Sequence, residues 1–582
     1  MNSLRVNTKN LYIVLIFNIG AIFCSGQSPI TPFESNPLTT CTYEECISFY
    51  KKLTTRSKFV KIVESGASDI DEPIHTVIIS TSNVKNYEDC KKQNKLIILI
   101  NNGIHPGEPD GIDASMIFAR DMIVDPQWRK YLDRICIVII PVYNIGGMKQ
   151  RNSHTRANQN GPLEYGFRGN VQNLDLNRDF IKMDSRNAVS FVTIFQKWKP
   201  HIFIDTHTTD GADYPYTMTL ISSQKNKLNP SIASCMYDQF VPELYAQMKK
   251  QKDEMFPYVD FEGLPNHGIY DFEDSPRYSS GYAALHHCLS FVTESHMLKP
   301  HRDRVNSQLR LLKTFVSTAD LYKNKILESI ESSKQFEIKK REYALSWTLD
   351  KSIADSLDFN AYEVEYPISP FLHKPYLFYN KNKVSSLRIP YYNYFVAQQT
   401  TTKPKFYIIH QAYHQVIDRL KKNNIPMTQL HSDSFINAQY YKIIDFQSPK
   451  KAYENHFLHS KVNVEKIAHS KKYFKGDYII PMGYESDRFV IEVLEPQAKD
   501  SYFAWNFFDA ITDRKEYFSD YIFTHQIGKI FEEQPQLFSE FQEKMKTDSS
   551  FKENVNAQLY FIYTNSKFSE PNFSIYPVAR VE

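Results

Sequence analysis

The sequence lacks several features that would place it in a simple class of protein. Its 582 residues carry a formal net charge of only +3, so a broad basic surface is not indicated and we expect no nucleic-acid partner. No internal repeat and no low-complexity tract is visible, which argues against a solenoid or a disordered chain. Apolar residues make up 42% of the sequence and charged residues 23%. This composition is typical of a globular protein, and the length predicts at least two domains.

A long apolar run is also lacking. The best candidate, residues 11–24, is shorter than the roughly 18 residues that a membrane-spanning helix needs. It follows two basic residues and precedes the small residues Ser25 and Gly26, which is the pattern of a secretory signal peptide. We therefore predict that residues 1–26 are a signal peptide and that the protein is exported, periplasmic or secreted. After cleavage we expect no stable membrane insertion; an uncleaved anchor is the alternative.

Cysteine is scarce and has no metal-site spacing. Of the seven cysteines, Cys24 lies in the predicted signal peptide. The other six form no Cys-x-x-Cys pair, so a thiolate zinc site is not indicated. An exported chain could pair some of them, but single buried thiols fit the sequence equally well. Disulfide connectivity does not follow from the sequence.

Short apolar runs alternate with helical patterns between about residues 42 and 330. Five runs have the length and β-branched content of buried strands: 76–79, 96–100, 135–140, 201–204 and 289–293. This alternation predicts an α/β fold with a mixed central sheet flanked by helices. Beyond about residue 343, prolines punctuate short segments rich in tyrosine and phenylalanine. We expect an α/β domain over residues 27–341 and a β-rich accessory region over 342–582, whose division into two subdomains is left open.

Polar residues stand at the ends of several of these predicted strands. His105 and Glu108 follow the second run, His207 follows the fourth, and Glu294 follows the fifth. A His and a Glu three residues apart are, taken alone, well explained as a turn residue and a helix cap. However, open α/β sheets place their ligand sites at the carboxyl ends of the strands. Several such segments in one domain therefore indicate a shared site.

The residue types at these strand ends suit a catalytic metal. Two imidazoles and one carboxylate, from His105, Glu108 and His207, form a ligand set for Zn²⁺ that leaves one position open for water. Glu294 is a separate carboxylate that can act as the base for that water.

The polar segment 173–179 adds groups that suit an anionic ligand. Arg178 can neutralise an anionic group of a substrate, and Asn177 can add hydrogen bonds to it.

Taken together, these segments resemble the zinc carboxypeptidase family. In the order of the family's motifs, the matching residues are His105-Pro-Gly-Glu108, Asp175-Leu-Asn-Arg178, the strand-end His207 and the later strand-end Glu294. The resemblance covers about residues 90–310, and the joint pattern is specific although each motif alone is common. The segment around Glu294 and the long C-terminal extension look closer to bacterial exported members. One departure is Asn144-Ile-Gly-Gly, where the family often has Asn-Pro-Asp-Gly in a supporting loop.

The resemblance implies one Zn²⁺ per chain, held by His105, Glu108 and His207. Asp175 is similar to the family's carboxylate that orients the first ligand histidine. Glu294 is similar to the catalytic glutamate, which takes a proton from water and delivers it to the leaving amine.

The resemblance also implies how substrate is held. Asn177 and Arg178 would bind the terminal carboxylate of a peptide, which restricts cleavage to the last residue. Tyr278 resembles the mobile tyrosine that closes over substrate, with Tyr282 as the second choice. For both tyrosines a plain packing role is the competing interpretation.

The arginine that stabilises the oxyanion is the least defined part of the resemblance. Arg168 lies a short step before Asn177, as in some compact members, and we favour it. Arg156 is the rival, and the residue that does not serve would be an ordinary salt-bridge partner.

We therefore predict a metallocarboxypeptidase that acts on the C-terminus of peptides or proteins. A related zinc amidohydrolase acting on acyl-amino acids or cell-wall peptides is one alternative. An exported binding protein without catalysis is the other, although the intact ligand set and Glu294 argue against it. The side chain preferred at the cleaved residue and the role of residues 342–582 do not follow from the sequence.

Overall fold

The computed structural model describes residues 28–258, 260, 264 and 267–582. The predicted signal peptide falls outside these residues. Within the described part of the chain, no helix is long and apolar enough to cross a membrane. The six cysteines from Cys41 to Cys288 are buried and free of disulfide bonds.

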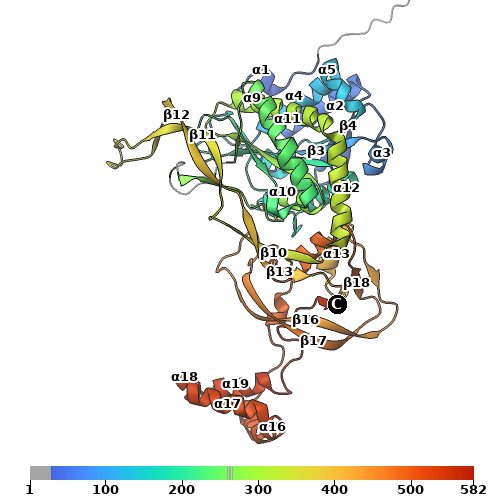
Figure 1. Cartoon of the computed structure of the whole chain (residues 1–582), viewed down its shortest axis with the longest axis vertical. Helices are drawn as coiled ribbons and strands as arrows, with labels where there is room; N and C mark the ends of the chain where they lie inside the picture. Colours follow the sequence, from blue (N-terminus) through green and yellow to red (C-terminus); the bar gives the residue numbers. More distant parts are fainter. Residues whose placement is uncertain (1–27, 259, 261–263, 265–266) are drawn as a thin grey trace, which may run out of the picture.

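An eight-stranded mixed sheet forms the centre of the N-terminal half (Figure 1). In spatial order its strands are β1 (Val60–Ala67), β2 (Pro73–Ile79), β4 (Ile135–Ile140), β3 (Leu96–Asn101), β5 (Ile202–Thr209), β9 (Leu289–His296), β6 (Met218–Ser222) and β7 (Phe256–Pro257). The middle strands β4, β3, β5 and β9 are parallel, whereas β2 and β6 pair antiparallel with β4 and β9. The residues of β3 and β4 are all buried and almost all apolar, as expected for strands covered on both faces.

Helices flank this sheet on both faces. The longer ones are α2 (Tyr43–Arg56), α4 (Asp110–Val124), α7 (Arg186–Trp198), α9 (Val241–Lys250), α10 (Ser279–Leu285), α11 (His301–Leu321) and α12 (Lys323–Lys339). Shorter ones are α1 (Pro32–Ser35), α3 (Tyr87–Lys92), α5 (Pro126–Arg129), α6 (Ile145–Lys149) and α8 (Pro230–Ser234), the last followed by a π-helical turn, Cys235–Phe240. The predicted α/β fold with a mixed central sheet is confirmed.

The contact between α4 and β5 depends on a glycine. Gly111 lies in the first turn of α4, and a Cβ atom there would be 1.9 Å from the hydroxyl oxygen of Thr206 on β5. Any larger residue would push the helix away from the sheet. Close packing of this first turn keeps the preceding loop over the carboxyl ends of β3 and β5.

The C-terminal half is rich in β-strands, as the sequence predicted, and most of them pair antiparallel. β10 (Glu342–Leu349) pairs with β13 (Phe395–Thr402), and the long hairpin of β11 (Asp355–Glu365) and β12 (Phe378–Tyr392) pairs with β8 (Ile269–Tyr270). A six-stranded antiparallel sheet contains, in spatial order, β15 (Thr428–Gln429), β18 (Tyr478–Pro481), β14 (Phe406–Ile409), β19 (Ala579–Val581), β16 (Ser434–Gln447) and β17 (Ser460–Tyr473). Two helices, α13 (His414–Lys422) and α14 (Asp487–Leu494), accompany it.

A small helical segment near the C-terminus differs from the predicted β-rich character. It contains α15 (Asp520–Phe523), α16 (Ile527–Glu533), α17 (Pro535–Thr547), α18 (Ser549–Lys552) and α19 (Val555–Asn565). Figure 1 shows these helices at the end of the molecule farthest from the central sheet. They bury a cluster of their own, which includes Phe523, Ile530 and Leu559. This local core explains why the segment folds as helices next to a sheet of long strands.

The main hydrophobic core continues from the α/β domain into the C-terminal region. One cluster of buried residues includes Ile98 and Phe203 of the central sheet as well as Tyr407, Phe489 and Trp505. The two halves of the chain therefore share a core across the boundary that the sequence placed near residue 341.

Candidate metal centre and active site

The loop between β3 and α4 places His105 and Glu108 over the end of the central sheet. Gly103 turns the chain with a φ of 66°, a conformation that glycine adopts without strain. The backbone N–H of Glu108 then donates to the carbonyl of His105 at 2.9 Å. Both side chains are almost fully buried, at 2% and 3% exposure.

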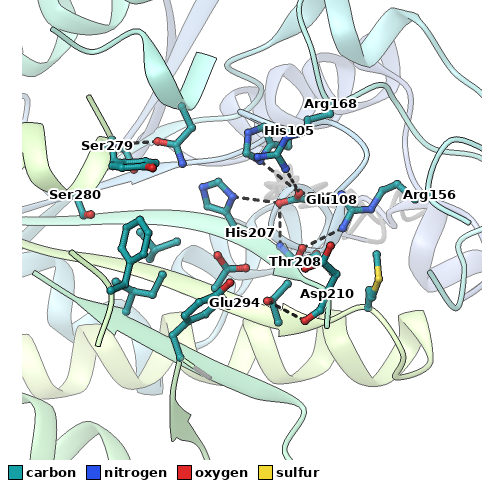
Figure 2. Close-up of a pocket in the computed structure, with 18 of the residues that line it drawn as sticks. His105, Glu108, Arg156, Arg168, His207, Thr208, Asp210, Ser279, Ser280 and Glu294 are labelled. Carbon is teal, nitrogen blue, oxygen red and sulfur yellow. Dashed lines mark hydrogen bonds and ion pairs between the residues drawn. The ribbon is translucent and has the colours of Figure 1, made fainter. Parts of the chain in front are cut away.

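β5 and β9 bring the other predicted groups to the same point. His207 on β5 is paired in register with Glu294 on β9, so the two side chains leave neighbouring parallel strands on the same face. One ligand atom from each of His105, Glu108 and His207 lies within 4.8 Å of the others. Figure 2 shows these three side chains converging, with Glu294 beside them.

The donor atoms fit a zinc ion. The Nε2 atom of His105 lies 2.8 Å from Asp175, and that of His207 lies 3.1 Å from Asp205. A carboxylate on Nε2 holds the proton there and turns Nδ1 toward the candidate metal position, which is the usual arrangement around a metal-binding histidine. Nδ1 of His207 lies 3.1 Å from Glu108. In the described part of the chain, Nδ1 of His105 is buried without a hydrogen-bond partner, although it lies 3.3 Å from Glu108. Such an orphaned nitrogen facing a carboxylate is what a cation would satisfy.

The carboxylates of the site differ in their affinity for protons. Burial raises the pKa of Glu294 to about 8, with the charge of Glu108 acting in the same direction and that of His207 against it. Burial acts on Glu108 and Asp175 too, but the charges of His105 and of nearby arginines outweigh it and hold the pKa of both below the usual range. Glu294 is therefore suited to carry a proton, whereas the other two remain anionic.

Both candidate oxyanion arginines reach the site. Arg168 contacts Glu108 at 3.2 Å and Asp175 at 2.9 Å, and its side chain is 46% exposed. Arg156 contacts Glu108 at 2.9 Å, donates to the carbonyl of Thr208 at 3.0 Å and is only 13% exposed. Each guanidinium makes three hydrogen bonds, and Arg168 is the more exposed of the two.

Asn177 and Arg178 line the same cavity as the candidate metal ligands. The Oδ1 atom of Asn177 accepts the backbone N–H of Ser279 at 3.0 Å, so its amide nitrogen remains as a donor for a ligand. The guanidinium of Arg178 lies over the ring of Tyr278, 4.5 Å from the ring centre. Tyr282, the second choice for the mobile tyrosine, is instead fully buried and donates to Asn423 at 2.7 Å.

One cavity of about 550 Å³ joins these groups. Its lining includes the three candidate ligands, Glu294, both arginine candidates, Asn177, Arg178 and Tyr278. The lining also includes four largely apolar side chains, those of Ile221, Tyr258, Phe272 and Val292. The cavity thus offers charged groups that suit a peptide backbone and apolar groups that suit a side chain.

Sequence reasoning assigned no role to Asp205, which contacts His207. The pattern Asp205-x-His207 on one strand was the available signal, because alternate residues of a strand share a face. It also assigned none to Glu454, whose carboxylate accepts the backbone N–H of Asp175 at 2.8 Å. No local sequence signal links Glu454 to Asp175, because the two residues are 279 positions apart in sequence.

Fold and site together define an α/β protein with a candidate two-histidine, one-carboxylate metal centre. The chain belongs to the zinc carboxypeptidase family, whose model matches residues 46–369. This match confirms the family that the motifs predicted.

The chain is also similar to proteins that are named carboxypeptidases. The chain is 20% identical to carboxypeptidase 2 of Trichophyton rubrum over 483 residues, which cover 78% of this chain and 81% of that one. Carboxypeptidase 2 of Trichophyton tonsurans is likewise 20% identical, over 70% of this chain and 73% of its own. Among solved structures, a metallo-carboxypeptidase from Burkholderia cenocepacia is 17% identical, covers 48% of this chain and 70% of its own, and has a TM-score of 0.37. The two relatives by sequence are fungal, so the bacterial exported type stays a prediction.

Proposed function

We propose that this metallocarboxypeptidase removes the C-terminal residue of peptides or proteins by adding water to the last peptide bond. The observation that supports this most is that one cavity is lined both by the metal set with Glu294 and by Asn177 and Arg178. The metal set and Glu294 would act on water, while Asn177 and Arg178 would bind a carboxylate of the same substrate. Only a peptide bond next to a free C-terminal carboxylate can contact both groups at once.

The ligands in this proposal are His105, Glu108 and His207, which would hold one Zn²⁺. When bound, zinc supplies Lewis acidity, which makes water a competent nucleophile near neutral pH. Asp175 and Asp205 hold the two imidazoles with Nδ1 turned inward. These two carboxylates thereby set the tautomer that a metal needs.

Glu294 moves the proton. It accepts a proton from water as the oxygen–carbon bond forms, and it gives that proton to the amine as the carbon–nitrogen bond breaks. Arg168 would stabilise the oxyanion formed in between, with Arg156 as the alternative.

Asn177 and Arg178 would bind the terminal carboxylate, with Tyr278 beside them. The guanidinium supplies charge and paired donors, and the amide of Asn177 adds another donor. Export is part of the same proposal. It rests on the N-terminal sequence pattern.

A C-terminal ladder assay tests this function. A mixed peptide pool is incubated with the protein, with and without a chelator, and the products are read by mass spectrometry. We expect stepwise loss of C-terminal residues that stops with chelator and returns with added zinc. Peptides with an amidated C-terminus are the matched control and should stay intact. Internal cleavage, or hydrolysis confined to acyl-amino acids or muropeptides in a parallel panel, would contradict the proposal.

A further inference from the structure

A tight turn of the C-terminal region lies on the candidate active site. It belongs to the segment between β16 and β17, where Tyr453 and His456 exchange two backbone hydrogen bonds, of 2.7 and 3.0 Å. The two residues between them, Glu454 and Asn455, have φ values of 50° and 70°. Asparagine tolerates this conformation, but a glutamate there is strained. Such a conformation persists only where surrounding contacts hold it.

Two contacts join the turn to the predicted substrate and metal residues. The hydroxyl of Tyr453 accepts a hydrogen bond from Nε of Arg178 at 2.9 Å. The carboxylate of Glu454 accepts the backbone N–H of Asp175 at 2.8 Å. Asp175 in turn contacts His105. Both ends of the segment 175–178 are therefore held from the C-terminal region.

The turn is itself anchored on both sides. His456 bonds to Asp184 at 2.7 Å and to Asn506 at 2.5 Å. The ring of Tyr453 stacks on that of Trp505, with centres 6.2 Å apart and planes within 16°. Trp505 belongs to the shared hydrophobic core and supports one face of the Tyr453 ring, which is itself 36% exposed.

We propose that this turn is a built-in part of the carboxylate-binding subsite and that Tyr453 is a positioning residue for Arg178. The inference rests on the proposed function and deepens it. Arginine loses much conformational freedom when it binds a ligand. With Nε bonded to Tyr453 and Nη1 bonded to the carbonyl of Asn177 at 2.9 Å, the guanidinium is held at the cavity wall before substrate arrives. A group ordered in advance binds its ligand more tightly.

Tyr453→Phe in the full-length, zinc-loaded protein is the test. The substitution keeps the ring stacked on Trp505 and removes only the hydroxyl. For the best peptide found in the ladder assay, we expect KM to rise about fivefold and kcat to stay within about twofold, because a partly exposed hydrogen bond to a charged group is lost. Tyr517→Phe is the matched control, since Tyr517 is 87% exposed, and should change neither constant.

A binding measurement separates positioning from a general structural role. Glu294→Gln protein is titrated with a peptide bearing a free C-terminal carboxylate and with the same peptide amidated, with and without Tyr453→Phe. We expect Tyr453→Phe to weaken binding of the carboxylate peptide about fivefold and leave the amide unchanged. Unchanged binding of both, or equal weakening of both, would overturn the inference while leaving the proposed function standing. If Glu294→Gln protein does not prefer the carboxylate peptide at all, both proposals fail.

Discussion

The two halves of the molecule each bury a cluster of charged side chains, and the clusters differ in how fully they are satisfied. We call His105, Glu108 and His207 the ligand cluster, and Arg580 with Glu495 the arginine cluster. In the arginine cluster both residues are at most 1% exposed and lie 2.5 Å apart.

The arginine cluster is complete. The two oxygens of Glu495 also accept hydrogen bonds from Tyr407 at 2.5 Å and Tyr441 at 2.6 Å, and Arg580 donates in addition to Thr401 at 2.7 Å. The ligand cluster leaves a buried nitrogen of His105 without a partner in the described chain and opens onto a cavity. Burial and charge alone therefore do not indicate a site. What distinguishes the ligand cluster is the combination of an unpartnered ring nitrogen, two further donor atoms within 4.8 Å and a cavity beside them.

Glu294→Gln should have the largest effect of the tests that compare the two clusters, and the effect should be on activity and not on stability. It removes the base and keeps the shape, so we expect kcat to fall by about 10³ to 10⁴-fold. The unfolding temperature should stay the same or rise slightly, since the change removes a buried carboxyl group whose raised pKa lowers the stability of the fold near neutral pH. Steady-state kinetics and thermal unfolding measure the two effects. Retained chelator-sensitive activity would remove Glu294 from its assigned role.

Glu495→Gln should show the opposite pattern. Leaving the charge of Arg580 buried without its anion should lower the free energy of unfolding by about 3 to 5 kcal/mol, while kcat per folded molecule stays close to wild type. Denaturant unfolding measures the loss. Glu582→Gln is the control, because this second partner of Arg580 is 50% exposed and its loss should cost no more than about 1 kcal/mol. A loss of kcat without a loss of stability in the Glu495 variant would contradict a purely structural role for the arginine cluster.

Removing the metal should affect the ligand cluster alone. With free zinc at a few hundred times its dissociation constant, chelation should lower the free energy of unfolding by about 3 kcal/mol. His207→Ala protein should lack this zinc-dependent gain, whereas Glu495→Gln protein should keep it. Calorimetry with and without zinc reads both. Equal zinc stabilisation of the His207 variant would place the ion elsewhere.

Substitution of Arg168 and of Arg156 should show which of the two stabilises the oxyanion. Arg168→Lys should lower kcat about 100-fold with little change in KM, as expected when a donor to the oxyanion is lost. Arg156→Lys should instead lower stability, because its guanidinium is bonded to Glu108, Thr208 and Gln159. The reverse assignment of the two effects would make Arg156 the oxyanion residue.

The smallest expected effect is a pH dependence at the turn that joins the halves. Burial lowers the pKa of His456, but the hydrogen bond to Asp184, the charge of Asp184 and the hydrogen bond to Asn506 together outweigh burial and raise the pKa above the ordinary 6.5. Lys182 opposes this rise. The pKa of Asp184 is about 2, so it stays anionic near neutrality. A histidine with a raised pKa stabilises the fold below its unfolded value, and the gain is lost as pH rises through the folded value.

His456→Asn removes that titration. The unfolding temperature of wild type should exceed that of the variant most near pH 6, and the difference should shrink as pH rises toward 9. If the difference in unfolding temperature grew with pH, the ion pair between His456 and Asp184 would not be stabilising.

Much of the site was predictable from sequence because each element is local. Glu108, His207 and Glu294 each follow an apolar strand, and the carboxyl ends of neighbouring parallel strands must meet at one edge of the sheet. The choice between Arg168 and Arg156 was not predictable, because both lie on irregular segments that reach the same carboxylate. The contact between Tyr453 and Arg178 spans 275 positions. It follows only from the packing of the two halves.

The zinc content of purified protein tests the central claim most directly. Metal analysis of wild type, Glu294→Gln, His207→Ala and Glu495→Gln protein, after dialysis against trace zinc, compares both clusters in one experiment. The account predicts about one zinc ion per chain in wild type and in the Glu294 and Glu495 variants, and almost none in His207→Ala. Full zinc occupancy in His207→Ala, or none in wild type, would contradict it.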